Sequence, residues 1–429
     1  MSHYKITDTA DLAMQSSVDP KYPKTEVIEE SQREVFNHEK YRSLGWIQTT
    51  IILVKLCFAT GVLAIPYAFQ VVGYAPGIIL LIFWGALATY YAHIMFRFRM
   101  RYHGVHSIAD AAGIMGGPIA RDITAGLFLL TWILATGSSL IGLSQGFKTL
   151  ASNHVCTVLW TLVAAVCAAL VASIKTLGRL AVLTWIGLTS IFIAVFIVVV
   201  GVTQVDRPAA APLEGPYELK VMAVGSPGFV AGLTAAINLF AGYGATPTFM
   251  PVISEMKSPK SFSKSLFSSQ AFLVICYVSF AIVVYLFCGQ YVASPSLGSA
   301  GGTIEKIAYG ISIPGFIMTS TLWVHLASKF LLVRILRNSK HLQDNSITHW
   351  TVWLGSTIGI SSLAFIIAEA VPFFGYLIGL IGSLCCAPTC LIIPALMGLY
   401  MYSEDNSHVV QSIIDAYQAG NVGGAFSCS

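Results

Sequence analysis

The sequence predicts an all-α integral membrane protein built from two related halves, and three observations support this fold class. Only 10% of the 429 residues are charged and 55% are hydrophobic, whereas about 25% of the residues of a soluble protein are charged. Apolar segments of about 20 residues, the length that crosses a bilayer as a helix, recur along the chain. Two of these segments, one in each half, carry the same interruption by glycine and proline.

Ten apolar segments are expected to cross the membrane as helices, because none shows the short alternating pattern of a β-barrel strand. They form a transmembrane core over 46–403, with repeat 1 at about 46–203 and repeat 2 at about 228–401. Residues 1–45 are expected to be a flexible cytosolic tail, and 404–429 a short C-terminal tail. The expected spans are 46–71, 74–96, 123–147, 155–174, 180–203, 228–253, 266–288, 307–333, 350–368 and 373–401.

The lysines and arginines between the spans predict that the N-terminus lies in the cytosol. In that orientation twelve basic residues lie in the inside loops and four in the outside loops, as the positive-inside rule requires. Ten spans then return the C-terminus to the cytosol. The segment from Gly104 to Asp122 is interpreted as a short helix on the cytosolic membrane surface, ended by Gly116-Gly117-Pro118.

Spans 1 and 6 are predicted to be broken helices. Gly61 precedes Pro66 by five positions, and Gly242 precedes Pro247 by the same number. Such breaks persist within a membrane where the freed backbone groups line a cavity. With five spans in each half the second half enters inverted, which is the LeuT-like 5+5 arrangement of secondary transporters. The alternative is that glycine and proline are simply frequent in membrane helices, but the matched positions favour the transporter.

The two breaks predict the substrate-binding site. A half-helix starting near Pro66 would direct N–H groups and a positive dipole end at a carboxylate, and the opposite break would offer free carbonyl groups to an ammonium. The expected substrate is therefore a net-neutral α-amino acid, although any single residue here could serve packing alone. The predicted substrate-binding residues are Ala59, Thr60, Gly61, Val62, Leu63, Phe240, Ala241, Gly242 and Tyr243.

Ion coupling is assigned to spans 1 and 8. Lys55 lies six positions before Gly61 and is predicted to occupy the place where other carriers bind sodium, with snorkelling to the interface as the alternative. On span 8, Thr321 and His325 share a helix face and Ser320 precedes them. Lys55 is expected to hold span 1 against span 8, where Ser320 and Thr321 offer oxygen atoms. Histidine ordinarily titrates near neutral pH, which makes His325 a proton-relay candidate, although a buried histidine more often only bonds a neighbouring helix.

The polar segments indicate neither an enzyme nor a cofactor site, because no nucleophile–base or metal-ligand spacing occurs there. Transport is expected to use the proton gradient, with neutral amino acids, protons and membrane lipids as partners and no nucleic acid. Cys385, Cys386 and Cys390 are interpreted as small packing residues within an apolar run. Cys156 and Cys288 fall near outside span ends, which leaves a disulfide between them open.

The run from Lys55 to Phe69, KLCFATGVLAIPYAF, resembles the first-span signature of the amino acid/auxin permease family of the amino acid–polyamine–organocation superfamily. Shorter similarities occur at 109–111, 255–259 and 393–396, and the closest resemblance is to fungal neutral amino acid permeases of the methyltryptophan-resistance type. This resemblance implies plasma-membrane uptake of neutral aliphatic and aromatic amino acids with protons. Sodium-coupled relatives have a neutral polar residue at the position of Lys55, so the lysine favours protons.

Two same-architecture alternatives are a vacuolar amino acid exporter and a transceptor that binds amino acids and signals without net transport. The resemblance also implies eleven spans. No stretch after Ser403 is long enough to cross a membrane, so the eleventh span is expected to be absent.

Overall fold

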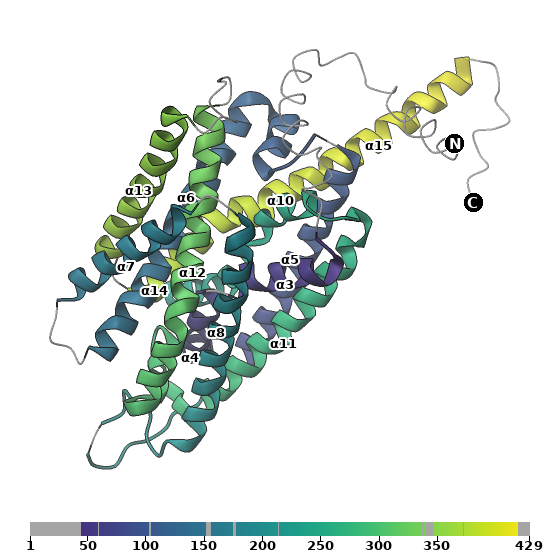
Figure 1. Ribbon diagram of the computed structural model, residues 1–429. Helices are drawn as coiled ribbons and strands as arrows, with labels where there is room; N and C mark the ends of the chain where they lie inside the picture. The colour runs from purple at the N-terminus through teal and green to yellow at the C-terminus, as the bar shows by residue number, and fades with distance from the viewer. Residues whose placement is uncertain are drawn as a thin grey trace, which may run out of the picture.

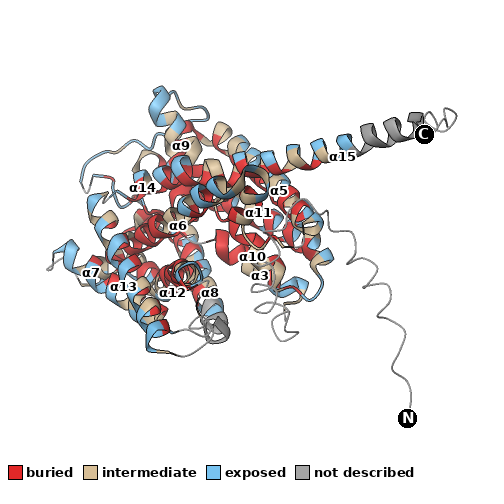
Figure 2. Cartoon of the chain, turned by 90° about the horizontal axis from the view of Figure 1, so that it is seen from above, coloured by how far each residue is buried: buried red, intermediate tan, exposed pale blue. Residues whose placement is uncertain are grey.

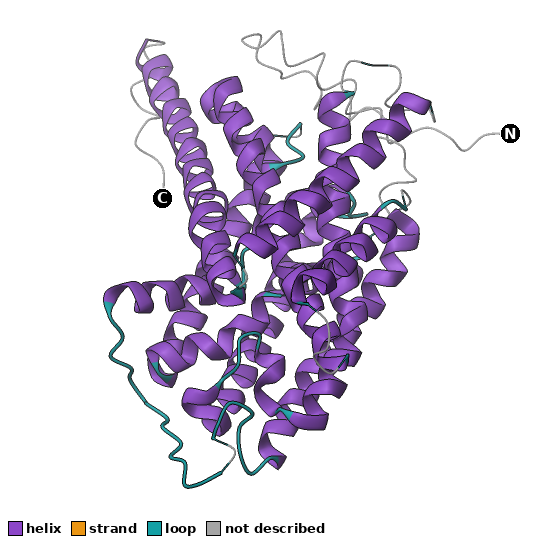
Figure 3. Ribbon diagram, turned by 90° about the vertical axis from the view of Figure 1, so that its left-hand side faces the viewer, coloured by secondary structure: helices purple, strands orange, loops and turns teal. Residues whose placement is uncertain are grey.

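The computed structural model describes residues 44–418 except 59, 103, 152–155, 175–176, 213, 337–338, 340–345 and 372. Over that part of the chain it consists of helices and loops, with one isolated β-bridge between Leu44 and Met256 (Figure 3). For 177–184 and 408–418 only the backbone is described. The predicted N-terminal tail lies outside the described residues except at its end.

The first half of the chain contains the predicted spans 1 to 5 (Figure 1). Span 1 is divided into three pieces, and spans 2 to 5 are single helices. The elements are α3 (Trp46–Cys57), η1 (Gly61–Ala64), α4 (Ile65–Val72), α5 (Tyr74–Arg101), α6 (Ile108–Leu150), α7 (Thr157–Ala172) and α8 (Leu177–Gln204).

The second half repeats this order, beginning again with a divided span. The elements are α9 (Phe229–Ala241), η2 (Thr246–Thr248), α10 (Phe249–Ser254), η3 (Pro259–Ser261), α11 (Phe262–Cys288), η4 (Gly289–Tyr291), η5 (Ser296–Ala300), α12 (Gly302–Ile335), α13 (Ile347–Ala370), α14 (Phe374–Leu380), the π-helical η7 (Ile381–Ile392) and α15 (Ile393–Gln418). The last helix continues past the expected end of span 10 and projects from the helical body (Figure 1).

Each of the ten predicted spans corresponds to a helix or a divided helix. Within the described residues eight helices are long and apolar enough to cross a membrane, or nine if the bent pair in span 1 counts as one. The remaining expected span is α7, which has 16 residues. Such a helix is about 24 Å long, so it falls short of the ~30 Å hydrocarbon core.

The predicted surface helix before span 3 is continuous with that span in α6. Gly117 separates the two, because its positive φ of 74° lies outside the helical region, where glycine carries no Cβ penalty. Pro118 follows and starts the next stretch of helix. The kink therefore falls within Gly116-Gly117-Pro118, where the surface helix was predicted to end.

The outer surface of the helical body is apolar. Figure 2 shows buried residues gathered at the centre of the bundle and exposed residues on its periphery. Large apolar side chains face outward on several spans; Ile79, Phe196 and Ile275 are 68%, 61% and 66% exposed. A soluble protein rarely exposes so much contiguous apolar surface, and lipid is the solvent that suits it.

The loop between α8 and α9 is tied to the C-terminal end of span 1. Gly225 N donates to Val72 O at 2.8 Å, and Tyr74 N donates to Met222 O at 3.2 Å. A side chain at Gly225 would meet Val71 O at 2.5 Å. We call residues 222–225 the outer strap, after the orientation that the loop charges predict; it joins the two halves of the chain where span 1 turns into span 2.

Gly225→Ala is expected to reduce uptake by about tenfold, because the new methyl group pushes the outer strap away from span 1. The conformation in which the strap is bonded to span 1 is then less populated. Overpacking of this kind costs ~1–3 kcal/mol. A free-energy change of this size is enough to alter the ratio of two conformations by about tenfold. Initial uptake rates check this. Gly228→Ala is the matched control, since nothing lies within 4 Å of its added methyl group; equal rates for the two variants would contradict a role for the strap.

Candidate functional site

Both predicted breaks are present in the structure. The helix of span 1 ends at Cys57 and restarts as η1 at Gly61, with a bend of 43° between the two parts. In span 6, α9 ends at Ala241, and a turn leads through η2 into α10. Both breaks therefore begin or end at the glycines that the sequence singled out.

The two glycines lie against each other. A Cβ atom added to Gly61 would be 3.0 Å from the Cα of Gly242 and 3.5 Å from the carbonyl oxygen of Ala241. Two helical backbones approach this closely only where neither has a side chain. The unwound parts of the two halves thus form one continuous backbone surface.

Tyr277 of α11 connects the two breaks from behind. Its hydroxyl is 2.9 Å from the carbonyl oxygen of Cys57 and 3.0 Å from that of Gly242, and it can donate its proton to either. These carbonyl groups are left without helical partners by the breaks. Tyr277 therefore satisfies part of the backbone that proline and glycine have freed.

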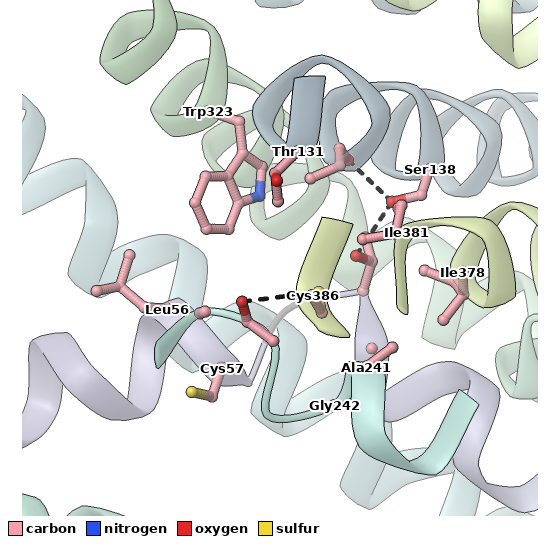
Figure 4. Close-up of a pocket in the computed structure, with 15 residues that line it drawn as sticks. Leu56, Cys57, Thr131, Ser138, Ala241, Gly242, Trp323, Ile378, Ile381 and Cys386 are labelled. Atoms are coloured by element: carbon pink, nitrogen blue, oxygen red, sulfur yellow. Dashed lines mark hydrogen bonds between the residues drawn. The ribbon is translucent and has the colours of Figure 1, made fainter. Parts of the chain in front are cut away.

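A small cavity lies in front of the breaks (Figure 4). It encloses about 60 Å³, room for a few water molecules, since one needs roughly 10–15 Å³. All its lining side chains are uncharged. They are Leu56, Cys57, Thr60, Gly61, Thr131, Ala135, Ser138, Ala241, Gly242, Gly244, Ala245, Trp323, Ile378, Ile381 and Cys386.

The polar part of the cavity is at the start of η1. The Thr60 and Ser138 hydroxyls are 3.3 Å apart, and Gly61 occupies the first helical position. The first N–H groups of a helix have no intrahelical partner and favour a negative ligand group. This end of the cavity can therefore hold a carboxylate between backbone N–H groups and a hydroxyl.

The carbonyl groups expected to be free at the other break already accept hydrogen bonds. Phe240 O accepts from Tyr243 N at 2.9 Å, Ala241 O accepts from Gly244 N at 3.0 Å, and Gly242 O is within reach of Tyr277. The reason is the turn after α9, which folds the chain back onto these atoms. An ammonium group would have to use their second lone pairs.

Four of the nine predicted substrate residues line the cavity: Thr60, Gly61, Ala241 and Gly242. The other described ones do not line it, and Ala59 lies outside the described residues.

Val62 and Leu63 are fully buried in the core. Phe240 packs on Trp84 with ring centroids 4.8 Å apart, and the Tyr243 hydroxyl donates to Leu81 O at 3.2 Å. Helical rotation explains this result, because residues within one turn of a cavity-lining position point to different sides.

The remaining lining residues were missed; Leu56, Cys57, Gly244 and Ala245 belong to the broken spans themselves, and the others come from α6, α12, α14 and η7. Thr131, Ala135 and Ser138 recur at spacings of four and three on α6, which places them on one face. Small and hydroxyl-bearing side chains at that spacing could have been used to predict the face of span 3 that lines the cavity. Trp323 and Cys386 carry no such signal, because only the three-dimensional packing brings α12 and η7 to the cavity.

Lys55 is buried and bonded to span 8, as predicted, but through a different residue. Its side chain is 2% exposed, and its Nζ donates to Thr319 Oγ1 at 3.1 Å. Gly187 of α8 lies on the other side, where an added Cβ would be 3.6 Å from Nζ. Lys55 therefore joins α3 to α12 inside the bundle rather than snorkelling outward.

Ser320 and Thr321, the oxygens expected beside Lys55, lie elsewhere. The Ser320 hydroxyl is 2.8 Å from that of Ser139 on α6. Thr321 is fully buried, and its hydroxyl has no hydrogen-bond partner within the described residues. Because successive helical residues point about 100° apart, Thr319 bonds Lys55 of α3 whereas the next two residues do not.

His325 is also on a different face from the residue that binds Lys55. It is six positions beyond Thr319, about 240° around the helix. Its ring packs edge-on against Trp353 of α13, with centroids 5.0 Å apart. The structure therefore does not bring His325 next to Lys55, and a direct relay between them is not supported.

One further expectation and one further interaction concern groups at the span ends. Cys156 is exposed and Cys288 is buried, and both are free thiols, so the disulfide left open between them is not formed. Glu255 interacts electrostatically with Lys329 of α12. Burial raises the pKa of the Glu255 carboxyl, and the Lys329 ammonium opposes that rise.

The broken spans, the uncharged cavity between them and the apolar periphery define an integral membrane transporter. Residues 42–416 match the family model described as transmembrane amino acid transporter protein, and the chain belongs to that family. The family consists of membrane transporters and not enzymes.

Several relatives are similar over most of their length. A transmembrane transporter of Gibberella moniliformis is 39% identical over 87% of this chain and 79% of its own length. The N amino acid transport system protein of Neurospora crassa is 27% identical, over 91% of this chain and 90% of its own. Amino acid transporter AVT3B of Arabidopsis thaliana is 24% identical, over 80% and 82%.

A solved structure supports the LeuT-like fold. Mhp1, a nucleobase-cation-symport-1 family transporter in a closed conformation with bromovinylhydantoin bound, superposes with a TM-score of 0.57. The match covers 83% of this chain and 78% of that one, at 12% identity. The predicted LeuT-like fold is thereby confirmed.

Proposed function

We propose that this transporter carries neutral amino acids together with protons across the plasma membrane by alternating access. The observation that carries the proposal is the pairing of an uncharged cavity with the N-terminus of a half-helix at Gly61. The helix N-terminus suits the substrate carboxylate, and the carbonyl groups of the opposite break suit its ammonium. The substrate therefore needs both charges and an uncharged side chain.

Proton coupling is inferred from Lys55. The buried ammonium holds α3 to α12 through Thr319. A bound sodium ion between these two helices would link them in the same way. A sodium ion next to the ammonium would place like charges a few ångströms apart, at a cost of several kcal/mol. Gain and loss of a proton at Lys55 would then make and break this link during the cycle.

The orientation follows from the loop charges. We place the N-terminus in the cytosol. The β-bridge between Leu44 and Met256, in which Leu44 N donates to Glu255 O and Leu44 O accepts from Lys257 N, then lies at the cytosolic ends of the broken spans. The outer strap then lies on the opposite face of the membrane.

Competition for uptake tests the substrate class. Unlabelled leucine or alanine is expected to inhibit the uptake of a labelled neutral amino acid, whereas arginine and glutamate at equal concentration should inhibit at least about tenfold more weakly. The reason is that an uncompensated charge in a cavity without charged side chains loses its hydration. Equal inhibition by arginine or glutamate would contradict the proposed substrate class.

A further inference from the structure

Trp323 is the one residue through which α12 contributes to the lining of the cavity among the described residues. The indole ring points into the cavity from the side opposite the broken spans (Figure 4). Only 7% of the residue is exposed. The neighbouring residues on α12 are directed elsewhere, Ser320 to α6 and Thr319 to Lys55.

Figure 4 shows the indole beside Thr131, on the far side of the cavity from Ile378. Ile378, Ile381 and Leu56 line the cavity with apolar branched side chains, whereas Thr60 and Gly61 supply the polar end. A substrate whose carboxylate is held at Gly61 must direct its side chain away from that end. Trp323 is the bulkiest group that this side chain meets.

Because the cavity is small, the volume of the Trp323 side chain determines how much space remains for the side chain of the substrate. About 60 Å³ is enclosed, and a tryptophan side chain is large, rigid and unable to shrink by changing one rotamer. No hydrogen bond holds its indole N–H to another described group, so its position depends on packing. A larger substrate side chain would have to displace the ring or keep the cavity from closing.

We propose that Trp323 sets the upper size limit of the substrate side chain, so that small and medium aliphatic amino acids are carried better than aromatic ones. This inference rests on the proposed function, because it concerns the specificity of the same site. Its chemistry is steric: the ring removes volume from an apolar pocket, and pocket size discriminates between substrates by about 10–200-fold per methylene-sized change.

The experiment compares initial uptake of labelled alanine, leucine, phenylalanine and tryptophan by purified protein in liposomes. Trp323→Ala is expected to raise the ratio of phenylalanine to alanine uptake efficiency by about tenfold or more. Trp323→Phe, which keeps an aromatic ring of smaller size, should give an intermediate ratio. Because the readout is a ratio within one variant, differences in expression or folding cancel.

Trp353→Ala is the matched control, since Trp353 is buried on α13 and does not line the cavity. Its uptake ratio should equal that of the unmodified protein. An unchanged ratio in Trp323→Ala, or an equal rise in Trp353→Ala, overturns the size limit while leaving the proposed function intact. If Trp323→Ala fails to insert, Trp323→Leu provides the same comparison. Absence of amino acid transport by the unmodified protein would instead overturn the proposed function.

Discussion

Gly61→Val and Gly242→Val are each expected to reduce amino acid uptake by at least about tenfold while the protein still reaches the membrane. A Cβ at Gly61 would already be 3.0 Å from the Gly242 backbone, and a Cβ at Gly242 would be 3.3 Å from the Leu239 carbonyl oxygen. Backbone atoms cannot give way as a flexible side chain can. Overpacking costs ~1–3 kcal/mol, here at the place where substrate must bind, so uptake falls by about tenfold or more.

Surface labelling and uptake of a labelled neutral amino acid measure the two parts of this prediction. Gly359→Val is the matched control, because Gly359 lies in a span with nothing within 4 Å of the added methyl group. The Gly359→Val protein should reach the membrane and take up the labelled amino acid normally. Normal uptake by Gly61→Val or Gly242→Val at the surface would disprove the assignment of the breaks to the substrate site.

Lys55→Ala is expected to abolish proton-driven accumulation while retaining exchange of internal for external substrate. The substitution removes the ammonium that bonds Thr319 at 3.1 Å and so removes the group proposed to respond to protonation. Substrate binding should persist, because Lys55 does not line the cavity. Accumulation against a gradient should fall to the equilibrium level, whereas counterflow should continue.

Two further variants separate the charge from the volume of this side chain. Lys55→Met keeps most of the volume and should behave as Lys55→Ala does. Thr319→Val removes only the acceptor and should weaken accumulation less. Lys306→Met serves as the control, since Lys306 is exposed at the start of α12. Full concentrative uptake by Lys55→Met would rule out the assigned role of Lys55.

The fold could be predicted because its signals are local. Apolar length defines spans such as α11 and α13, and the spacing of Gly61 from Pro66 and of Gly242 from Pro247 placed both breaks to within a few residues. The kink at Gly117 was visible for the same reason. The expected span at 155–174 is the exception, because its helix has only 16 residues.

The site was predicted only in part, because the spacing of residues along the sequence does not define how each helix is rotated about its own axis. Thr60 and Gly242 line the cavity, whereas Tyr243, the next residue, points to Leu81. Lys55 could be expected to meet span 8, but a one-residue difference in the contact, Thr319 instead of Ser320, depends on how α12 is turned. Trp323 enters the site through packing between helices that are distant in sequence.

The most direct test of the central claim is uptake of labelled leucine by purified protein in sodium-free liposomes with an imposed pH gradient, acidic outside. The account predicts that leucine accumulates above its equilibrium level, that a protonophore abolishes this accumulation, and that replacing choline by sodium has no effect. Accumulation that requires sodium, or the absence of any leucine flux with or without the gradient, would contradict the account.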